Sequence, residues 1–427
     1  SAPSQPCSGI QPPSGTGSTT LTKTTTSDPL AGSAGVTAAT GHMSSVAALT
    51  APAAPTTGAN VTFGFGAAPS MPTGCLAVSP SSGVWTVSCA NGGTYHFGLL
   101  TVSGGATLNF ATSGSGSTYT FSQGVFTQGG TNTTFGAGTF NIGPMSSGCN
   151  GSATYSICNT GTSLTFGGPS TFVISSGVSN GGGTIIVMGS GSTNSYQIGP
   201  GSDGNALLVQ GGARMTLADA TGVSDLFQLK GAVNVGGGGC TILPAAAQHD
   251  INGNFITSGG VVMGAGVYTV NGYAGFGANS GGDASCNGST VGVSGAGVTL
   301  VISGVSTPTS GVCSGQAFCV ASGFSNVTLT APSSGTTSGL VVLGPASSSI
   351  AAGALFTGGA SGTSLSGVFY FPDGPITLGG GASIGNGANQ CLELIGTQIS
   401  LTGGTAAAST CVGGGSGSSG STVALVQ

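Results

Sequence analysis

Charge is the property that this sequence lacks most. Charged residues make up 3% of its 427 residues, against about a quarter in ordinary soluble domains. The lysines and arginines are Lys23, Arg214 and Lys230 alone, and the formal net charge is −5. Nucleic acids and anionic membranes are bound through clustered lysine and arginine, so the composition excludes both kinds of partner. A large surface with so little charge repels its own copies weakly, and we expect self-association.

Long hydrophobic runs are also missing. No stretch of about 18 apolar residues occurs, so no segment is expected to cross a membrane as a helix. The chain opens with Ser1-Ala-Pro and shows no charged and apolar signal sequence, which suits a processed protein or an excised fragment.

A chain so rich in glycine could be disordered, but disordered chains are poor in apolar residues, and 38% of this chain is hydrophobic. We therefore expect its 86 glycines to form turns around a buried core.

Short runs of alternating apolar and small polar residues recur between glycine turns from about residue 95 to the C-terminus. Examples are Val298-Thr-Leu-Val-Ile302, Val327-Thr-Leu-Thr330 and Val368-Phe-Tyr-Phe371. Such runs are rich in β-branched and aromatic side chains, which is typical of strands. They are too short for stable helices and lack the spacing of amphipathic ones. The sequence therefore predicts an all-β fold.

Two all-β architectures fit many short strands: a parallel β-solenoid, or antiparallel β-sandwich domains. The strands outnumber those of one sandwich, and the turns use Gly-Gly and Ser-Gly rather than the Asn-Gly of tight hairpins. A phrase of Gly-Gly-Ala followed shortly by Leu or Ile also recurs, at Gly104–Leu108, Gly211–Leu217 and Gly380–Ile384. A weak repeat of this kind is typical of solenoid coils. We therefore predict the solenoid, with the sandwich as the alternative.

The chain divides by composition into an N-terminal part, 1–60, and a body, 61–427. The first part is rich in Ser, Thr, Ala, Pro and Gly, and its simplest interpretation is a linker or extended arm. Apolar stretches at Gly35–Thr40 and Val46–Thr50 leave open an arm that packs along the solenoid or on a neighbouring subunit. They also mark the best place for a short helix.

Eleven cysteines are present, and their spacing does not suit zinc, whose ligands come as closer pairs. Disulfides between neighbouring cysteines are the better interpretation, although sequence does not fix connectivity. Oxidised cysteines indicate an exported protein. Cys7 is left over, as a free thiol or as half of an intermolecular bond. The expected pairs are Cys75–Cys89, Cys149–Cys158, Cys240–Cys286, Cys313–Cys319 and Cys391–Cys411.

The C-terminal part, about 260–427, resembles the secreted region of TadG-like proteins, which are associated with bacterial tight-adherence pilus assembly. The resemblance depends on five phrases in order: Gly266–Val270, Gly295–Gly304, Val327–Gly335, Gly367–Leu378, and Cys391–Gly404 followed by Cys411. It implies an exported bacterial surface protein with a β-helical body, a Cys391–Cys411 disulfide and no catalytic residue. Many members have an N-terminal membrane helix, which this chain lacks, and that leaves room for a released or polymerised form.

Two groups of residues suggest a chemical site, a set of carboxylates and a His-Asp pair. Many β-helices cleave glycans with clustered carboxylates, and the candidate cluster here is Asp203, Asp219 and Asp225. The same residues also suit a weak cation site or turns, and turns are the favoured interpretation. His249-Asp250 could form half of a catalytic triad, but a surface loop is the favoured interpretation.

The leading functional hypothesis is an exported bacterial cell-surface protein with a structural or adhesive role, which self-assembles into an extracellular fibre or pilus-like filament. Its expected partners are copies of itself and host or abiotic surfaces, with no enzyme activity, catalytic residue, metal or cofactor. The alternatives are a glycan-processing β-helix enzyme and a monomeric adhesin that binds through exposed Thr, Tyr and Asn.

Overall fold

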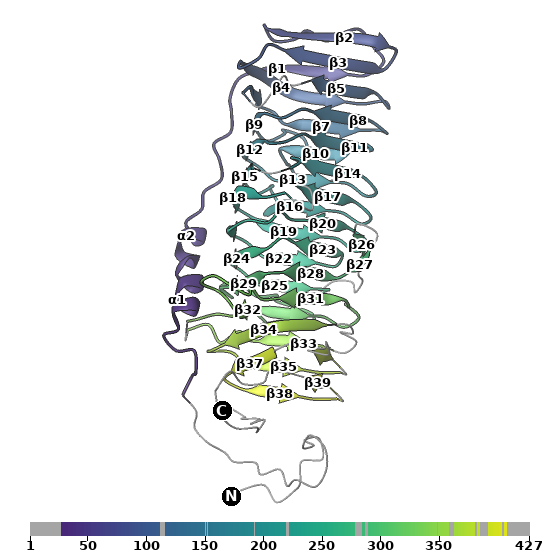
Figure 1. Ribbon diagram of the computed structural model, residues 1–427. Helices are drawn as coiled ribbons and strands as arrows, with labels where there is room; N and C mark the ends of the chain where they lie inside the picture. The colour runs from purple at the N-terminus through teal and green to yellow at the C-terminus, as the bar shows by residue number, and fades with distance from the viewer. Residues whose placement is uncertain are drawn as a thin grey trace, which may run out of the picture.

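The computed structural model winds the chain into a parallel β-solenoid with three strands in most coils (Figure 1). Hydrogen bonds join 35 strands into a single sheet, and most strands pair in parallel with the strands three places before and after them. The prediction of a solenoid is confirmed, and the sandwich alternative is wrong. The structure describes residues 27–111, 116–149, 151, 153–191, 193–218, 222–277, 284–286, 289–347, 349–357, 363–380, 382–384, 392–403 and 405–407.

Stacked strands form three long faces, and two long strands connect them. Strand β4 (Thr94–Val102) continues from the first face into the second, and β34 (Ser364–Phe371) continues from the third into the first. The other strands of the first face are β6 (Thr118–Phe121), β9 (Thr139–Ile142), β12 (Thr171–Ile174), β15 (Asn194–Ile198), β18 (Ser224–Leu229), β21 (Gln248–Ile251), β24 (Gly266–Val270), β29 (Val298–Ile302), β32 (Leu340–Leu343) and β37 (Leu392–Gly396).

The second face begins with β1 (Ala59–Phe63), which pairs in parallel with β4. It continues with β7 (Val125–Gln128), β10 (Ile157–Thr160), β13 (Val178–Asn180), β16 (Asn205–Val209), β19 (Ala232–Val235), β22 (Phe255–Thr257), β25 (Ala274–Phe276), β30 (Phe318–Val320), β33 (Ala354–Phe356), β35 (Ile376–Leu378) and β38 (Ile399–Leu401).

The third face begins with an antiparallel hairpin of β2 (Cys75–Ser81) and β3 (Val84–Cys89), which among the described strands is the one departure from parallel pairing in the large sheet. It continues with β5 (Thr107–Ala111), β8 (Asn132–Phe135), β11 (Ser163–Phe166), β14 (Ile185–Met188), β17 (Arg214–Leu217), β20 (Cys240–Ile242), β23 (Gly260–Met263), β28 (Val293–Ala296) and β31 (Val327–Thr330). Two small sheets remain, an antiparallel pair of β26 (Ala284–Cys286) and β27 (Ser289–Val291) and a parallel pair of β36 (Ser383–Ile384) and β39 (Ala406–Ala407).

The recurring Gly-Gly-Ala phrase forms the turn that leads into the third face. Gly104 and Gly212 have φ angles of +69° and +74°, which a side chain would strain, and the alanines that follow, Ala106 and Ala213, are buried. The turns of successive coils lie on one another, since a Cβ added to Gly212 would be 3.7 Å from the backbone nitrogen of Gly183. The phrase therefore marks coil corners, as the repeat predicts.

Aromatic rings fill the interior behind the first face. Eight rings in consecutive strands lie with neighbouring centroids 3.8 to 5.8 Å apart, and we call them the ring column. Parallel register places the inward side chain of each strand over that of the strand before it, so similar residues stack. The ring column consists of Tyr95, Tyr119, Phe140, Phe172, Tyr196, Phe227, His249 and Tyr268.

The segment before β1 lies along the outside of the first face, and we call residues 28–58 the strap. It contains two short helices, α1 (Ala34–Gly41) and α2 (Met43–Ala47), and Figure 1 shows it running beside the solenoid. Helix α1 covers the favoured stretch Gly35–Thr40, whereas α2 begins earlier than the second stretch and overlaps it only at Val46 and Ala47. Of the two interpretations of the N-terminal part, the packed arm therefore holds for the strap, while residues 1–26 lie outside the described residues.

Four disulfides staple the described coils, and each joins cysteines that neighbour one another along the chain, as expected. The pairs are Cys75–Cys89, Cys149–Cys158, Cys240–Cys286 and Cys313–Cys319. Cys7, Cys391 and Cys411 lie outside the described residues.

Candidate functional site

The strap is held to the first face by side chains far away in the sequence. The Tyr370 hydroxyl donates to Oδ2 of Asp28 at 2.5 Å, and Asn252 Nδ2 donates to the Ala47 carbonyl oxygen at 3.0 Å. The strap therefore begins at the C-terminal end of the solenoid and runs back toward its N-terminal end, against the winding direction.

Apolar contacts anchor helix α1. Val36 and Ala39 are buried against outward side chains of the first face, which makes this a second, smaller core outside the coils. Burying such side chains stabilises the docked helix by about 1 to 3 kcal/mol each. The strap is thus part of the folded body. The partners on the solenoid are Val301, Leu340, Leu343, Tyr370 and Ile395.

A column of polar side chains crosses the first face beneath the strap. Gln197 Nε2 donates to Gln228 Oε1 at 3.2 Å, and Gln228 Nε2 donates to Asp250 Oδ2 at 3.3 Å. His42 of the strap closes the column, with Nε2 2.8 Å from Asp250 Oδ1. Asp250 is therefore buried but fully partnered on the outside of the sheet.

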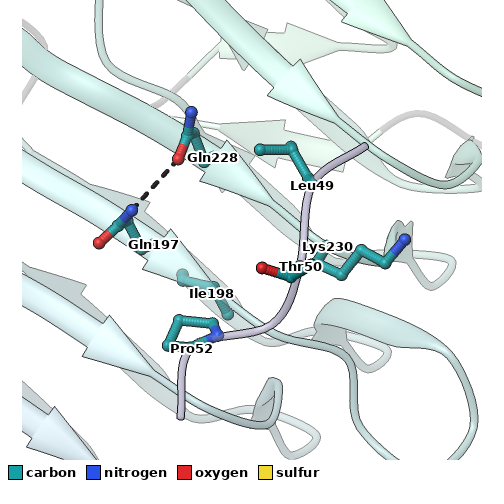
Figure 2. A pocket seen from close by; sticks show the side chains of 7 residues that line it. All are labelled: Leu49, Thr50, Pro52, Gln197, Ile198, Gln228 and Lys230. Carbon is teal, nitrogen blue, oxygen red and sulfur yellow. Dashed lines mark hydrogen bonds between the residues drawn. The ribbon is translucent and has the colours of Figure 1, made fainter. Parts of the chain in front are cut away.

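A pocket opens where the strap crosses these strands, and Figure 2 shows Gln197 and Gln228 on one side of it. Strap residues line the opposite side. Among the residues that line the pocket, Lys230 alone is charged. The walls of the pocket are therefore part of the contact between the strap and the sheet. The lining residues are Leu49, Thr50, Pro52, Gln197, Ile198, Gln228 and Lys230.

The candidate carboxylate cluster does not form between the two members that the structure describes. Asp225 lies exposed near the start of β18, while Asp203 lies in the turn after β15, beyond the opposite end of the same strand pair. Asp203 accepts hydrogen bonds from Tyr155 Oη at 2.5 Å and Asn205 Nδ2 at 2.7 Å, which is the turn role that the sequence favours. Asp219 lies outside the described residues.

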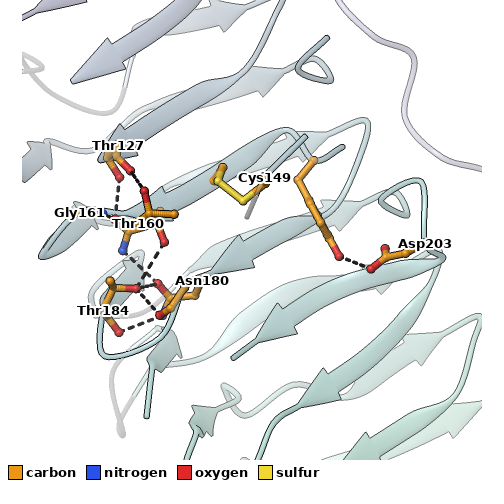
Figure 3. The surroundings of a disulfide bond; sticks show 11 residues. Thr127, Cys149, Thr160, Gly161, Asn180, Thr184 and Asp203 are labelled. Atoms are coloured by element: carbon orange, nitrogen blue, oxygen red, sulfur yellow. Dashed lines mark hydrogen bonds between the residues drawn. A yellow bond between two sulfur atoms is a disulfide. The ribbon is translucent and has the colours of Figure 1, made fainter. Parts of the chain in front are cut away.

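Tyr155 and its surroundings illustrate how a loop is fixed to the second face. Burial, and after it the bond to Asp203, raises the pKa of the Tyr155 hydroxyl, so it stays protonated and donates. Figure 3 shows Asp203 near the disulfide of Cys149, which ties the same loop to β10. The Tyr155–Asp203 hydrogen bond and the Cys149–Cys158 disulfide thus have a structural role, which is to hold this loop against the second face.

Figure 3 also shows a buried polar ladder that the sequence analysis missed. Thr127 Oγ1 donates to Asn159 Oδ1 at 2.6 Å, and Asn159 Nδ2 donates to Asn180 Oδ1 at 3.0 Å. Asn180 Nδ2 then donates to the Arg214 carbonyl oxygen at 2.7 Å in the next coil. Asparagine and threonine at the ends of second-face strands were the available signal, because stacked amides satisfy backbone groups where the chain turns.

His249 and Asp250 are not half of a triad, and they do not lie in a surface loop as the sequence suggests. Both belong to strand β21, where neighbouring side chains point to opposite faces. His249 points into the ring column, stacked 3.8 Å from Tyr268, while Asp250 points outward to the strap. Among the described residues, no three His, Cys, Asp or Glu side chains gather as metal ligands would.

Comparisons of the chain with protein-family models, with curated proteins and with solved structures gave no match. The described part contains no helix long and apolar enough to cross a membrane.

The N-terminal end of the solenoid is open. Within the described residues, β1 pairs only with β4 and β2 only with β3, so both strands have one edge without a neighbour. Leu76 and Val78 point outward from β2, and they are 61% and 49% exposed. Ala77, between them, packs against the end of the core but is only partly buried. This open end is the candidate interaction surface.

Proposed function

We propose that this chain is an exported bacterial cell-surface protein with a structural or adhesive role, and that it self-assembles into an extracellular fibre. The observation that carries the proposal is the parallel ladder that continues through the described coils to the free edges of β1 and β2. Unpaired strand edges bind strands of other chains unless they are protected. A solenoid has different surfaces at its two ends, and contact between the unlike ends of successive copies is head-to-tail, which builds filaments rather than closed dimers.

The composition of the open end supports the same proposal. No Asp, Glu, Lys or Arg occurs between Ala59 and Cys89, so no like charges oppose the approach of a second copy. The four disulfides support export, because such bonds persist in oxidising compartments. Membership of the TadG-like proteins is part of the proposal, and its first four phrases fall on or around β24, β29, β31 and β34.

Electron microscopy and analytical ultracentrifugation of the purified native protein test the proposal. We expect filaments whose width matches one solenoid, in equilibrium with monomer, and a larger assembled fraction at higher concentration. A single monomeric species across the whole concentration range would contradict self-assembly.

A monomeric adhesin is the second candidate, and a column of polar side chains on the third face favours it. Thr107, Asn132 and Ser163 stack in register and point outward, with Ser163 Oγ donating to Asn132 Oδ1 at 2.8 Å. Regular hydroxyl and amide groups on a flat face suit contact with a glycan or mineral surface. If the isolated monomer binds such surfaces as tightly as assembled protein does, this candidate replaces the fibre.

A further inference from the structure

The free edge of β2 has a specific strand-accepting geometry. Cys75 lies opposite Cys89, and the Ala90 backbone N–H donates to the Gly74 carbonyl oxygen at 3.0 Å. Because hydrogen-bonded and non-hydrogen-bonded pairs alternate in antiparallel strands, Leu76 and Val78 bond to β3, and the N–H and C=O of Ala77 point away from it. Pro80 blocks the far end, so the acceptor is the stretch Cys75–Ser79.

Side chains around this acceptor favour an added strand. Leu76 and Val78 project from the outer face, while Ala77 is half covered at the end of the core. A strand placed beside β2 would cover these residues and satisfy the backbone groups of Ala77.

The chain carries a segment suited to this edge, Ser18-Thr-Thr-Leu-Thr-Lys-Thr-Thr-Thr26. It contains six threonines and no proline, and β-branched residues favour strands. It directly precedes the anchor of the strap, where Asp28 is bound by Tyr370 at the C-terminal end of the solenoid.

The segment does not reach β2 of its own copy while the strap is docked. Along the third face, β3 and β34 are ten strand steps apart, or about 48 Å at roughly 4.8 Å per step. Ser18 precedes Asp28 by ten residues and reaches at most about 35 Å from it, even fully extended. When a second copy stacks head-to-tail on the first, the β2 strand of the second copy comes close to residues 18–26 of the first.

We propose that residues 18–26 of one copy add as a strand to the free edge of β2 in the next copy, which links subunits head-to-tail. The proposal rests on the self-assembly proposed above and names its contact.

Paired substitutions test the acceptor. In the full chain, L76K/V78K puts two charges beside the edge, and A77P removes its central N–H donor while leaving the bonds to β3 intact. V305K/V312K is the matched control, because Val305 and Val312 are 62% and 54% exposed at a distant site. We expect both β2 variants to raise the concentration needed for filaments by about tenfold or more, which corresponds to about 1.4 kcal/mol, with the control unchanged. Unaltered melting temperatures would confirm that the variants fold.

A photo-reactive benzophenone residue at position 22 identifies the partner. Isotopically light and heavy copies are mixed as monomers in equal amounts, assembled, irradiated and analysed by mass spectrometry. We expect cross-links from position 22 to residues 75–81, half of them between light and heavy chains. Cross-links within single copies only, or to another surface, would overturn the proposal, as would filaments that tolerate L76K/V78K and A77P. If the unmodified protein never assembles, the proposed function fails and this contact fails with it; if it assembles through another contact, the function survives alone.

Discussion

His249 occupies a position in the ring column that its neighbours fill with tyrosine or phenylalanine. Its Nε2 lies 2.8 Å from the Pro244 carbonyl oxygen, and its buried Nδ1 has no hydrogen-bond partner of ordinary geometry. Burial lowers the pKa of His249 to about 4, more than nearby backbone groups raise it. The folded protein therefore requires the neutral imidazole.

This shift makes stability dependent on pH. Between the ordinary pKa of 6.5 and about 4, the unfolded chain binds a proton at His249 and the folded chain does not. The free energy of unfolding therefore falls as pH drops through this window, by about 3 kcal/mol from this residue. We expect H249F to lose that part of the pH dependence, measured by chemical denaturation at pH 7 and pH 4.5. His96 is exposed, so H96F is the control and should keep the dependence.

At the scale of single elements, hydrogen bonds hold the strap on either side of its two helices, and an apolar contact surface on the first face holds α1. Neither helix is long enough to be stable alone, since isolated helices of this length are marginal in water. Their order therefore depends on contact with the first face.

Two adjacent alanines allow a matched test of this dependence. Ala39 faces the solenoid and is 3% exposed, whereas Ala38 faces solvent. A39D would bury an unpaired charge, so we expect the strap to detach, with amide exchange in residues 34–47 faster by about tenfold or more. A38D carries the same propensity change and should leave exchange close to normal. Equal protection in both variants would mean that the apolar contact surface does not hold the helix.

The sequence predicts the coils better than it predicts the strap. The residues of Val298–Ile302 predict a strand and those of Gly104-Gly-Ala106 predict a turn, because in both cases the pattern lies within the segment itself. The docking of Val36 depends on Val301 and Leu340, which are hundreds of residues away and show no pattern that points to it. The loop predicted for His249-Asp250 is wrong for a related reason: two adjacent polar residues suggest a loop, but His249 stacks inside the solenoid and Asp250 is covered by the strap.

For the molecule as a whole, stability resembles that of repeat proteins, in which each coil contacts mainly its neighbours. The contribution of each disulfide to the free energy of unfolding is then expected to grow with the length of chain between its two cysteines. Cys240–Cys286 spans 46 residues and ties the hairpin of β26 and β27 to β20, while Cys313–Cys319 spans six.

We expect removal of the longer link to cost more. Chain-entropy reasoning gives losses of about 4 kcal/mol for C240S/C286S and about 2 kcal/mol for C313S/C319S. Denaturation of the two double variants under oxidising conditions measures the difference. The reverse order would show that local packing, rather than restriction of the unfolded chain, sets the contribution of these bonds.

The direction of the strap also fixes an order of events during biosynthesis. Asp28 and Val36 leave the ribosome early, but Tyr370 and Leu340, which receive them, are made more than 300 residues later. Because these partners belong to the last coils, the strap can dock only after those coils have formed. Its closure over the first face is thus a late step, which completes the subunit only once the last coils are in place.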